Sequence, residues 1–218
     1  MIAKAAVVVL AVLLLAVPAS AATITWDFGV IGPAGEQPAG TTFNSGGFTL
    51  SAASITPNGA VPPFGAVTQP IFVKNFGGDE NGLGACQGSG NCGPANEIDN
   101  SPRDILRIDR DSLALTNWQF QMGSTTSGET WHVWVGTDAT CSVGCVNLGT
   151  GTDELVNHPL PDAGRFIFFG TDAPIGTGDT LLHLISAQTV PEPASLILLG
   201  LGLSGLGVAL RRRKAARA

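Results

Sequence analysis

The stretch TNWQFQM, residues 116–122, indicates the fold class of this chain. Trp118, Phe120 and Met122 alternate there with asparagine and glutamine residues. A period of two places one set of side chains on a buried face and the other on a solvated face, as in an antiparallel sheet. Residues 116–122 therefore predict a β-strand that packs one face against a hydrophobic core.

Similar apolar or alternating runs recur along the chain and are separated by clusters of Gly, Pro, Asn and Asp. These runs are residues 22–30, 46–54, 66–76, 104–110, 113–122, 130–136, 165–172 and 180–190. About eight strands in a segment of this length favour an all-β fold. We expect a β-sandwich, jelly-roll-like in its connections, with a barrel as the second choice.

The N-terminal residues 1–21 have the pattern of a secretory signal peptide. Lys4 precedes an unbroken apolar run over residues 5–17, and Pro18 then leads to the small residues Ala19, Ser20 and Ala21. This order predicts export and cleavage after Ala21. An uncleaved N-terminal anchor is the alternative, but the apolar run is shorter than the roughly 17 to 25 residues of a spanning helix.

The C-terminal residues 190–218 combine three features. Val190, Pro191, Glu192 and Pro193 form a tetrapeptide whose prolines favour an extended, accessible link. Residues 194–210 follow without a charge, and as a helix they would span about 26 Å of a hydrocarbon core of about 30 Å. The basic tail, residues 211–218, begins with the four adjacent cations Arg211, Arg212, Arg213 and Lys214. These cations would stop translocation and keep the preceding domain outside.

Tetrapeptide, apolar helix and basic tail, in this order, resemble the PEP-CTERM sorting signal of bacterial envelope proteins. The resemblance implies that an exosortase, a membrane protease and transpeptidase, recognises the tail. It further implies a surface or matrix protein linked to exopolysaccharide and biofilm, held briefly in the inner membrane and then released to the cell surface. A permanent membrane anchor is the alternative, since the sequence shows no cleavage.

Residues 22–189, the passenger domain, are strongly acidic. They contain 5 basic and 16 acidic residues, a net charge of −11. Nucleic-acid binding is not expected, because affinity for phosphates comes from Lys and Arg. An acidic surface also repels anionic polymers unless a divalent cation bridges the two.

The four cysteines form two local pairs in the sequence, Cys86 with Cys92 and Cys141 with Cys145. In an exported protein the default expectation is disulfides, and two local loops are the simplest of three connectivities. A zinc site of four thiolates is the alternative, but the spacings depart from paired C-x2-C.

Residues 77–109 are a glycine-rich acidic segment and a candidate calcium site. Asp79, Glu80, Glu97 and Asp99 supply the carboxylate oxygens that calcium prefers. Their spacing does not match an EF-hand loop, so a solvated acidic loop before a strand near Asp104 is the simpler interpretation.

The sequence predicts a non-enzymatic protein, because the common catalytic motifs are absent from it. A carbohydrate-binding module is the main alternative, with Trp131 and Trp134 as candidate stacking rings. These two tryptophans lie on opposite sides of an ideal strand, so we expect one of them to be exposed. A glycosidase that uses paired carboxylates is a weaker alternative.

Overall fold

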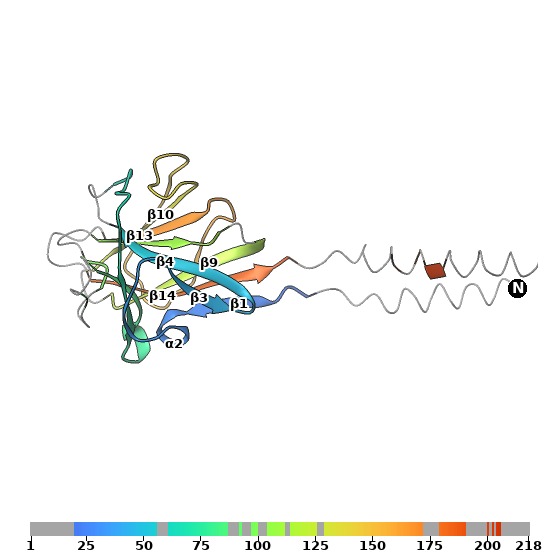
Figure 1. Ribbon diagram of the computed structural model, residues 1–218, viewed down its shortest axis with the longest axis horizontal. Coiled ribbons are helices and arrows are strands. Elements are labelled where there is room, and N and C mark those ends of the chain that lie inside the picture. Colours follow the sequence, from blue (N-terminus) through green and yellow to red (C-terminus); the bar gives the residue numbers. More distant parts are fainter. Residues whose placement is uncertain are drawn as a thin grey trace, which may run out of the picture. The chain divides into compact units, whose positions relative to one another are not determined.

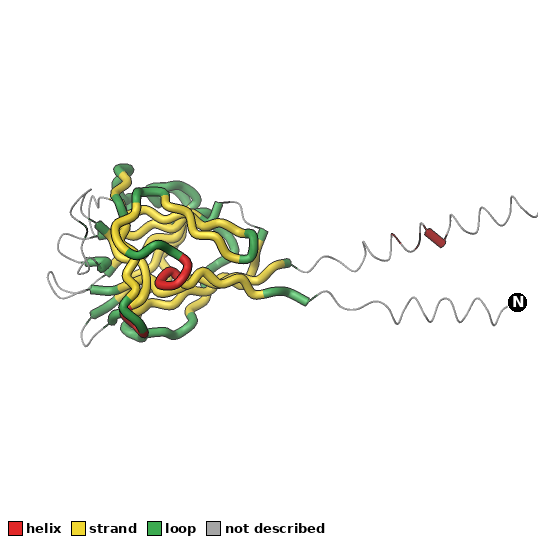
Figure 2. The backbone as a smooth tube through the Cα atoms, turned by 60° about the horizontal axis from the view of Figure 1, so that its bottom comes forward, coloured by secondary structure: helices red, strands yellow, loops and turns green. Residues whose placement is uncertain are grey.

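The computed structural model describes residues 20–55, 61–86, 92, 97–99, 104–111, 114–125, 129–171, 179–190, 200, 202, 204 and 205. Residues Thr23–Thr189 form one compact unit, and Met1–Ala22 with Val190–Ala218 form another. Strands make up almost all of the regular structure in Thr23–Thr189 (Figure 2).

Two antiparallel sheets build this unit (Figure 1). Sheet A contains, in spatial order, β12 (His158–Pro159), β9 (Leu115–Gly123), β14 (Leu181–Thr189), β7 (Asn81–Ala85), β6 (Ile71–Asn75) and β2 (Gly35–Gln37), and β1 (Thr23–Asp27) also pairs with β14. Sheet B contains β11 (Val146–Gly151), β10 (Trp131–Gly136), β13 (Phe166–Gly170), β8 (Ile105–Asp109), β4 (Phe48–Ile55) and β3 (Thr41–Ser45), and β5 (Thr68–Gln69) pairs with β4. The described helices of Thr23–Thr189 are the short α2 (Phe28–Ile31) and the 3-10 turn η1 (Gly78–Glu80).

The all-β prediction is confirmed, and each of the eight expected runs contains a strand. The sequence did not indicate β2, β3, β7, β11 and β12, which are short or rich in glycine and polar residues. The finer jelly-roll connectivity stays a prediction.

The main core lies between the two sheets. Trp118, Phe120 and Met122 of β9 are buried there, while Asn117 is exposed and Gln119 and Gln121 are half-buried, so the alternation is confirmed. Rings of Trp26 and Trp118 stack with centroids 5.8 Å apart. Such aromatic pairs add to the stability that their burial provides.

A second apolar cluster covers part of the outer face of sheet B. It consists of Ile55, Phe64, Ile105, Trp134, Cys141, Phe166 and Phe168. Phe64 reaches it from the loop between β4 and β5, and its N–H donates to the carbonyl of Thr140 at 2.7 Å. Two loops therefore cover this half of the outer face.

Strand β7 corrects the expectation of a solvated acidic loop between residue 77 and the strand near Asp104. Asn81–Ala85 pairs with β6 along its whole length and is buried except at Asn81. The backbone of Gly82 lies so close to β14 that a Cβ atom there would be 2.6 Å from the carbonyl oxygen of Leu182. This close approach requires glycine at position 82. The glycines of residues 81–85, which the sequence suggested as part of a loop, therefore belong to a packed strand.

The two ends of Thr23–Thr189 lie on neighbouring strands. β1 pairs with β14 in antiparallel register, with Thr23 opposite Gln188. The last strand of the domain therefore lies beside the strand that begins it. In the tail, the described residues Gly200, Gly202, Ser204 and Gly205 are helical. Among the described residues, no helix has the length and apolar character needed to cross a membrane.

Candidate functional site

An open polar pocket lies on the half of sheet B that the outer apolar cluster leaves uncovered. It has a volume of about 230 Å³ and is lined by Thr42, Thr49, Ser51, Asp109, Asp111 and Arg165. Strand register explains this gathering: Thr42 lies opposite Ser51, and Ser51 lies opposite Asp109. Three neighbouring strands thus present a row of two hydroxyls and one carboxylate.

Asp109 and Arg165 form a two-pronged ion pair at the end of this row. Arg165 donates from Nε to Oδ1 of Asp109 at 2.8 Å and from Nη2 to Oδ2 at 2.7 Å. Partial burial by itself would raise the pKa of Asp109, but the hydrogen bonds from Arg165 and from the Asp111 N–H lower it on balance. The carboxylate is therefore ionised at neutral pH and accepts hydrogen bonds.

Packing holds the guanidinium of Arg165 in place. It lies 5.0 Å from the centroid of the Phe166 ring, and the guanidinium of Arg107 lies 5.4 Å from the same centroid. Arg107 in turn donates to the carbonyl of Ala139 at 3.0 Å. The pocket thus presents fixed donors and acceptors together with the exposed hydroxyls of Thr42 and Thr49.

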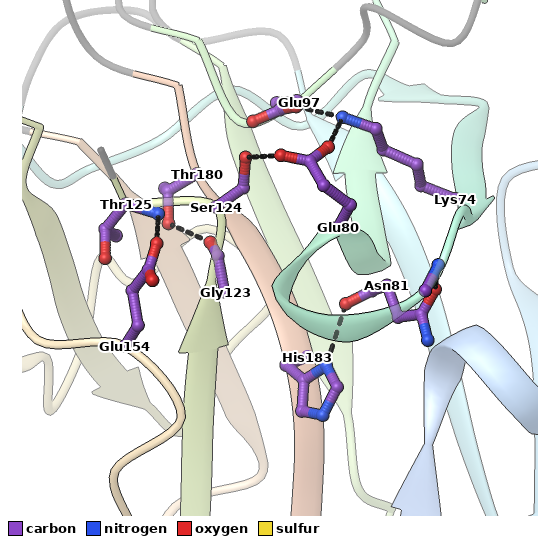
Figure 3. Close-up of polar contacts among 11 residues, drawn as sticks. Lys74, Glu80, Asn81, Glu97, Gly123, Ser124, Thr125, Glu154, Thr180 and His183 are labelled. Carbon is purple, nitrogen blue, oxygen red and sulfur yellow. Dashed lines mark hydrogen bonds and ion pairs between the residues drawn. The ribbon is translucent and has the colours of Figure 1, made fainter.

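A second polar cluster lies beside η1, where Lys74 contacts two carboxylates (Figure 3). The ammonium of Lys74 pairs with Glu80 and with Glu97, and the Ser124 hydroxyl donates to Glu80 at 3.0 Å. Ser124 has a left-handed backbone, with φ of 54°. Such a conformation is unfavourable for serine, so the surrounding contacts must hold it.

Burial and charge act against each other in this cluster. Burial alone would lower the pKa of Lys74, but its hydrogen bonds to Glu80 and Glu97 raise it on balance. The hydrogen bond from Lys74 lowers the pKa of Glu80, whereas burial raises that of Glu97. The side chains of Lys74 and Glu97 are 7% and 9% exposed. Lys74 and Glu97 thus form an enclosed ion pair, whereas the side chain of Glu80 is 39% exposed.

The four carboxylates expected to bind calcium do not converge in the described structure. Glu80 and Glu97 meet around Lys74, whose ammonium already supplies a positive charge. Asp99 instead contacts Asp179, and burial together with this neighbour raises its pKa to about 8. Within the described ranges, no three His, Cys, Asp or Glu side chains are grouped as a metal site requires. The calcium site stays a prediction that the described geometry does not support.

The expectation that Trp131 or Trp134 presents an open ring is wrong for the described structure. The two side chains do lie on opposite faces of sheet B, Trp131 in the main core and Trp134 in the outer cluster. Both are buried, with 6% and 2% exposure, because the outer face at Trp134 is also covered.

The three histidines contact aromatic rings, an asparagine side chain and a backbone carbonyl. His132 is buried and stacks on the Trp134 ring with centroids 3.6 Å apart, and its Nε2 lies 2.7 Å from Oδ1 of Asn147. His158 lies against the Trp131 ring, and Nδ1 of His183 is 2.9 Å from the carbonyl oxygen of Asn81. The ring contacts pack His132 and His158 against tryptophans, and the His183 contact links β14 to β7.

Two disulfides join the pairs expected from the sequence. Cys86 bonds to Cys92 with Cα atoms 5.3 Å apart, and Cys141 bonds to Cys145 with Cα atoms 5.0 Å apart. The second bridge closes the loop between β10 and β11, and its Cys141 belongs to the outer apolar cluster.

The expected sorting residues lie mostly outside the described residues. Val190 is described, is 54% exposed and directly follows the end of β14 at Thr189. Pro191, Glu192 and Pro193 are outside the described residues, as are Arg211, Arg212, Arg213 and Lys214. Their roles stay predictions from the sequence.

Comparison with known proteins identifies the tail. Residues 189–214 match the PEP-CTERM protein-sorting motif, which begins where β14 ends. No curated protein matches the chain significantly. The motif implies export, sorting to the cell envelope and an exosortase as the processing partner. The chain is thus a protein that carries a PEP-CTERM sorting motif after an all-β domain.

Proposed function

We propose that this protein is a non-enzymatic component of the cell surface or extracellular matrix that exosortase cleaves and that associates with exopolysaccharide. The PEP-CTERM motif at residues 189–214 is the observation that carries this proposal. The motif begins where β14, the last strand of the domain, ends at Thr189. Cleavage within the motif would therefore release the domain with all its described strands, which supports the proposal.

Two features of the domain, its disulfides and its net charge, support a location outside the cytoplasm. Disulfides persist in oxidising compartments and are rare where thiols are kept reduced. The described domain contains two of them, and each closes a short loop. A net charge of −11 over residues 22–189 also favours solubility at a surface that is exposed to water.

The non-enzymatic part of the proposal is supported by how the polar groups are used. The buried ammonium of Lys74 is shared by two carboxylates, so it is charged and is a poor base. The open pocket presents an ionised carboxylate already paired with Arg165, which suits binding better than proton transfer.

Replacement of the tail residues tests the proposal. Changing Pro191, Glu192 and Pro193 to alanine should leave an uncleaved precursor in the inner membrane of the native host. Changing Arg211, Arg212 and Arg213 to glutamine should weaken retention and mislocalise the precursor. Cell fractionation and immunoblotting would measure both. Normal surface delivery of either variant would contradict the proposal.

A further inference from the structure

We propose that the polar pocket of sheet B binds one sugar residue of a neutral polysaccharide. The pocket is lined by Thr42, Thr49, Ser51, Asp109, Asp111 and Arg165. This inference rests on the proposed function, because it names the ligand class through which a matrix protein would associate with exopolysaccharide.

The chemistry of the lining matches vicinal hydroxyl groups. Each sugar hydroxyl both donates and accepts, so it needs a partner of each kind. Asp109 accepts, and the hydroxyls of Thr42 and Ser51 can do both. The Thr49 hydroxyl donates to Oδ1 of Asn44 and can still accept. Arg165 has five N–H groups, of which its bonds to Asp109 use two. A pocket that only donated would favour an anion, and one that only accepted would favour a cation.

The charges at the pocket favour a neutral ligand. Asp109 and Asp111 are opposed by Arg165 in the lining and by the nearby Arg107, whose guanidinium lies 5.4 Å from the centroid of the Phe166 ring and whose charge acts on Asp109. Together these four side chains carry no net charge, so they do not attract an ionic polymer. The net charge of −11 over residues 22–189 further repels polyanions such as uronic acid polymers.

The pocket is held in its binding geometry before a ligand arrives. Thr42, Ser51 and Asp109 lie on paired strands, and neighbouring strands are about 4.8 Å apart. Arg165 is fixed by its two bonds to Asp109 and by the Phe166 ring. Little side-chain freedom is then lost on binding, which improves affinity.

The size and openness of the pocket suit one unit of a chain. Its volume of about 230 Å³ lies below the roughly 300 to 1,000 Å³ of sites that enclose drug-sized ligands. Thr42, Thr49 and Asp111 are exposed, so neighbouring units can continue along the sheet surface. A polymer presents many such units, and weak single contacts then add up to retention.

Affinity electrophoresis of the full-length chain in detergent tests the inference. The gels would contain dextran or mannan as neutral polymers, alginate as an anionic polymer, or the exopolysaccharide fraction of the native host. The test variant is Thr42→Ala with Ser51→Ala. The matched control is Thr25→Ala with Ser186→Ala, an equivalent Thr–Ser cross-strand pair on sheet A.

We expect retardation by at least one neutral polymer and an apparent dissociation constant about fivefold or more higher for the test variant, since two hydrogen bonds are lost. The control should bind like wild type. Asp109→Asn provides a second variant and should weaken binding by at least as much. Retardation by no neutral polymer, equal retardation by alginate, or unchanged binding of both pocket variants would overturn the inference. Intact mass of the chain recovered from the host reports sorting independently, so a sorted chain that binds no polysaccharide would contradict only this inference.

Discussion

Two pairs of a basic side chain with a carboxylate lie in different environments in this domain. Lys74 and Glu97 have side chains that are 7% and 9% exposed, whereas Arg165 and Asp109 are 50% and 20% exposed. The first pair is enclosed beside η1, where Lys74 also contacts Glu80, and the second borders an open pocket lined by hydroxyls. We infer from this difference in burial that the two pairs have different roles. The enclosed Lys74–Glu97 pair maintains structure, and the open Arg165–Asp109 pair is accessible to a ligand.

Removing each cation is the strongest way to break this comparison. Lys74→Met should lower the free energy of unfolding by about 3 kcal/mol, because two carboxylates lose their shared partner and one of them is buried. Arg165→Met, the matched change at the open pair, should cost less than about 1 kcal/mol. Urea unfolding followed by tryptophan fluorescence measures both. Equal losses would show that burial does not separate the two sites.

The covered and open halves of sheet B provide a second comparison. Replacing Cys141 and Cys145 with serine should destabilise the domain by about 2 kcal/mol, as expected for a bridge that closes a loop of this length. The loss would loosen the cover over Trp134 and leave the polar pocket unchanged. Thermal unfolding with and without reductant measures the effect. A wild-type melting temperature for this variant would contradict a role of the bridge in covering the cluster.

The pH dependence of stability sharpens the account of the acidic segment. The pKa of Asp99 is raised to about 8, so the folded state binds a proton that the unfolded state releases near pH 4. Stability from this group is complete below the unfolded pKa and is lost as the pH rises towards about 8, at no more than about 1.4 kcal/mol per pH unit. Asp179→Asn should flatten this slope. Urea titrations from pH 5 to 8 would decide, and a stability that rises over this range would contradict the assignment.

The smallest stability effect is expected at the pocket carboxylate. Asp109→Asn keeps the shape of the side chain but removes its charge, and the cost should be less than about 1 kcal/mol because the pair is open to solvent. The same variant should weaken polysaccharide binding about fivefold or more, so stability and binding separate at this residue. A large loss of stability would place Asp109 with the structural pairs instead.

The sequence predicted the strands whose apolar residues alternate, because period-two patterns report which face is buried. It missed β7, whose glycines are needed for close packing against β14, and β11, whose residues are mostly exposed or half-buried. It also predicted an exposed ring at Trp131 or Trp134. That prediction failed because the loop carrying Phe64 and the loop closed by Cys141 cover the outer face.

The pocket could not be predicted from the sequence, since its parts meet only through strand register. Arg165 is 56 residues from Asp109, and Ser51 reaches Asp109 only because β4 and β8 are neighbours. Pairings over such distances depend on the whole topology. The sorting signal, in contrast, could be predicted from the sequence, because its residues are contiguous and can be recognised without knowledge of the fold.

Intact mass spectrometry of the protein recovered from the surface or medium of its native host tests the central claim most directly. The account predicts a chain that lacks residues 1–21 and the segment beyond about residue 193, with Cys86, Cys92, Cys141 and Cys145 oxidised. A mass that retains residues 194–218 would contradict exosortase processing and would make the protein a permanent resident of the membrane.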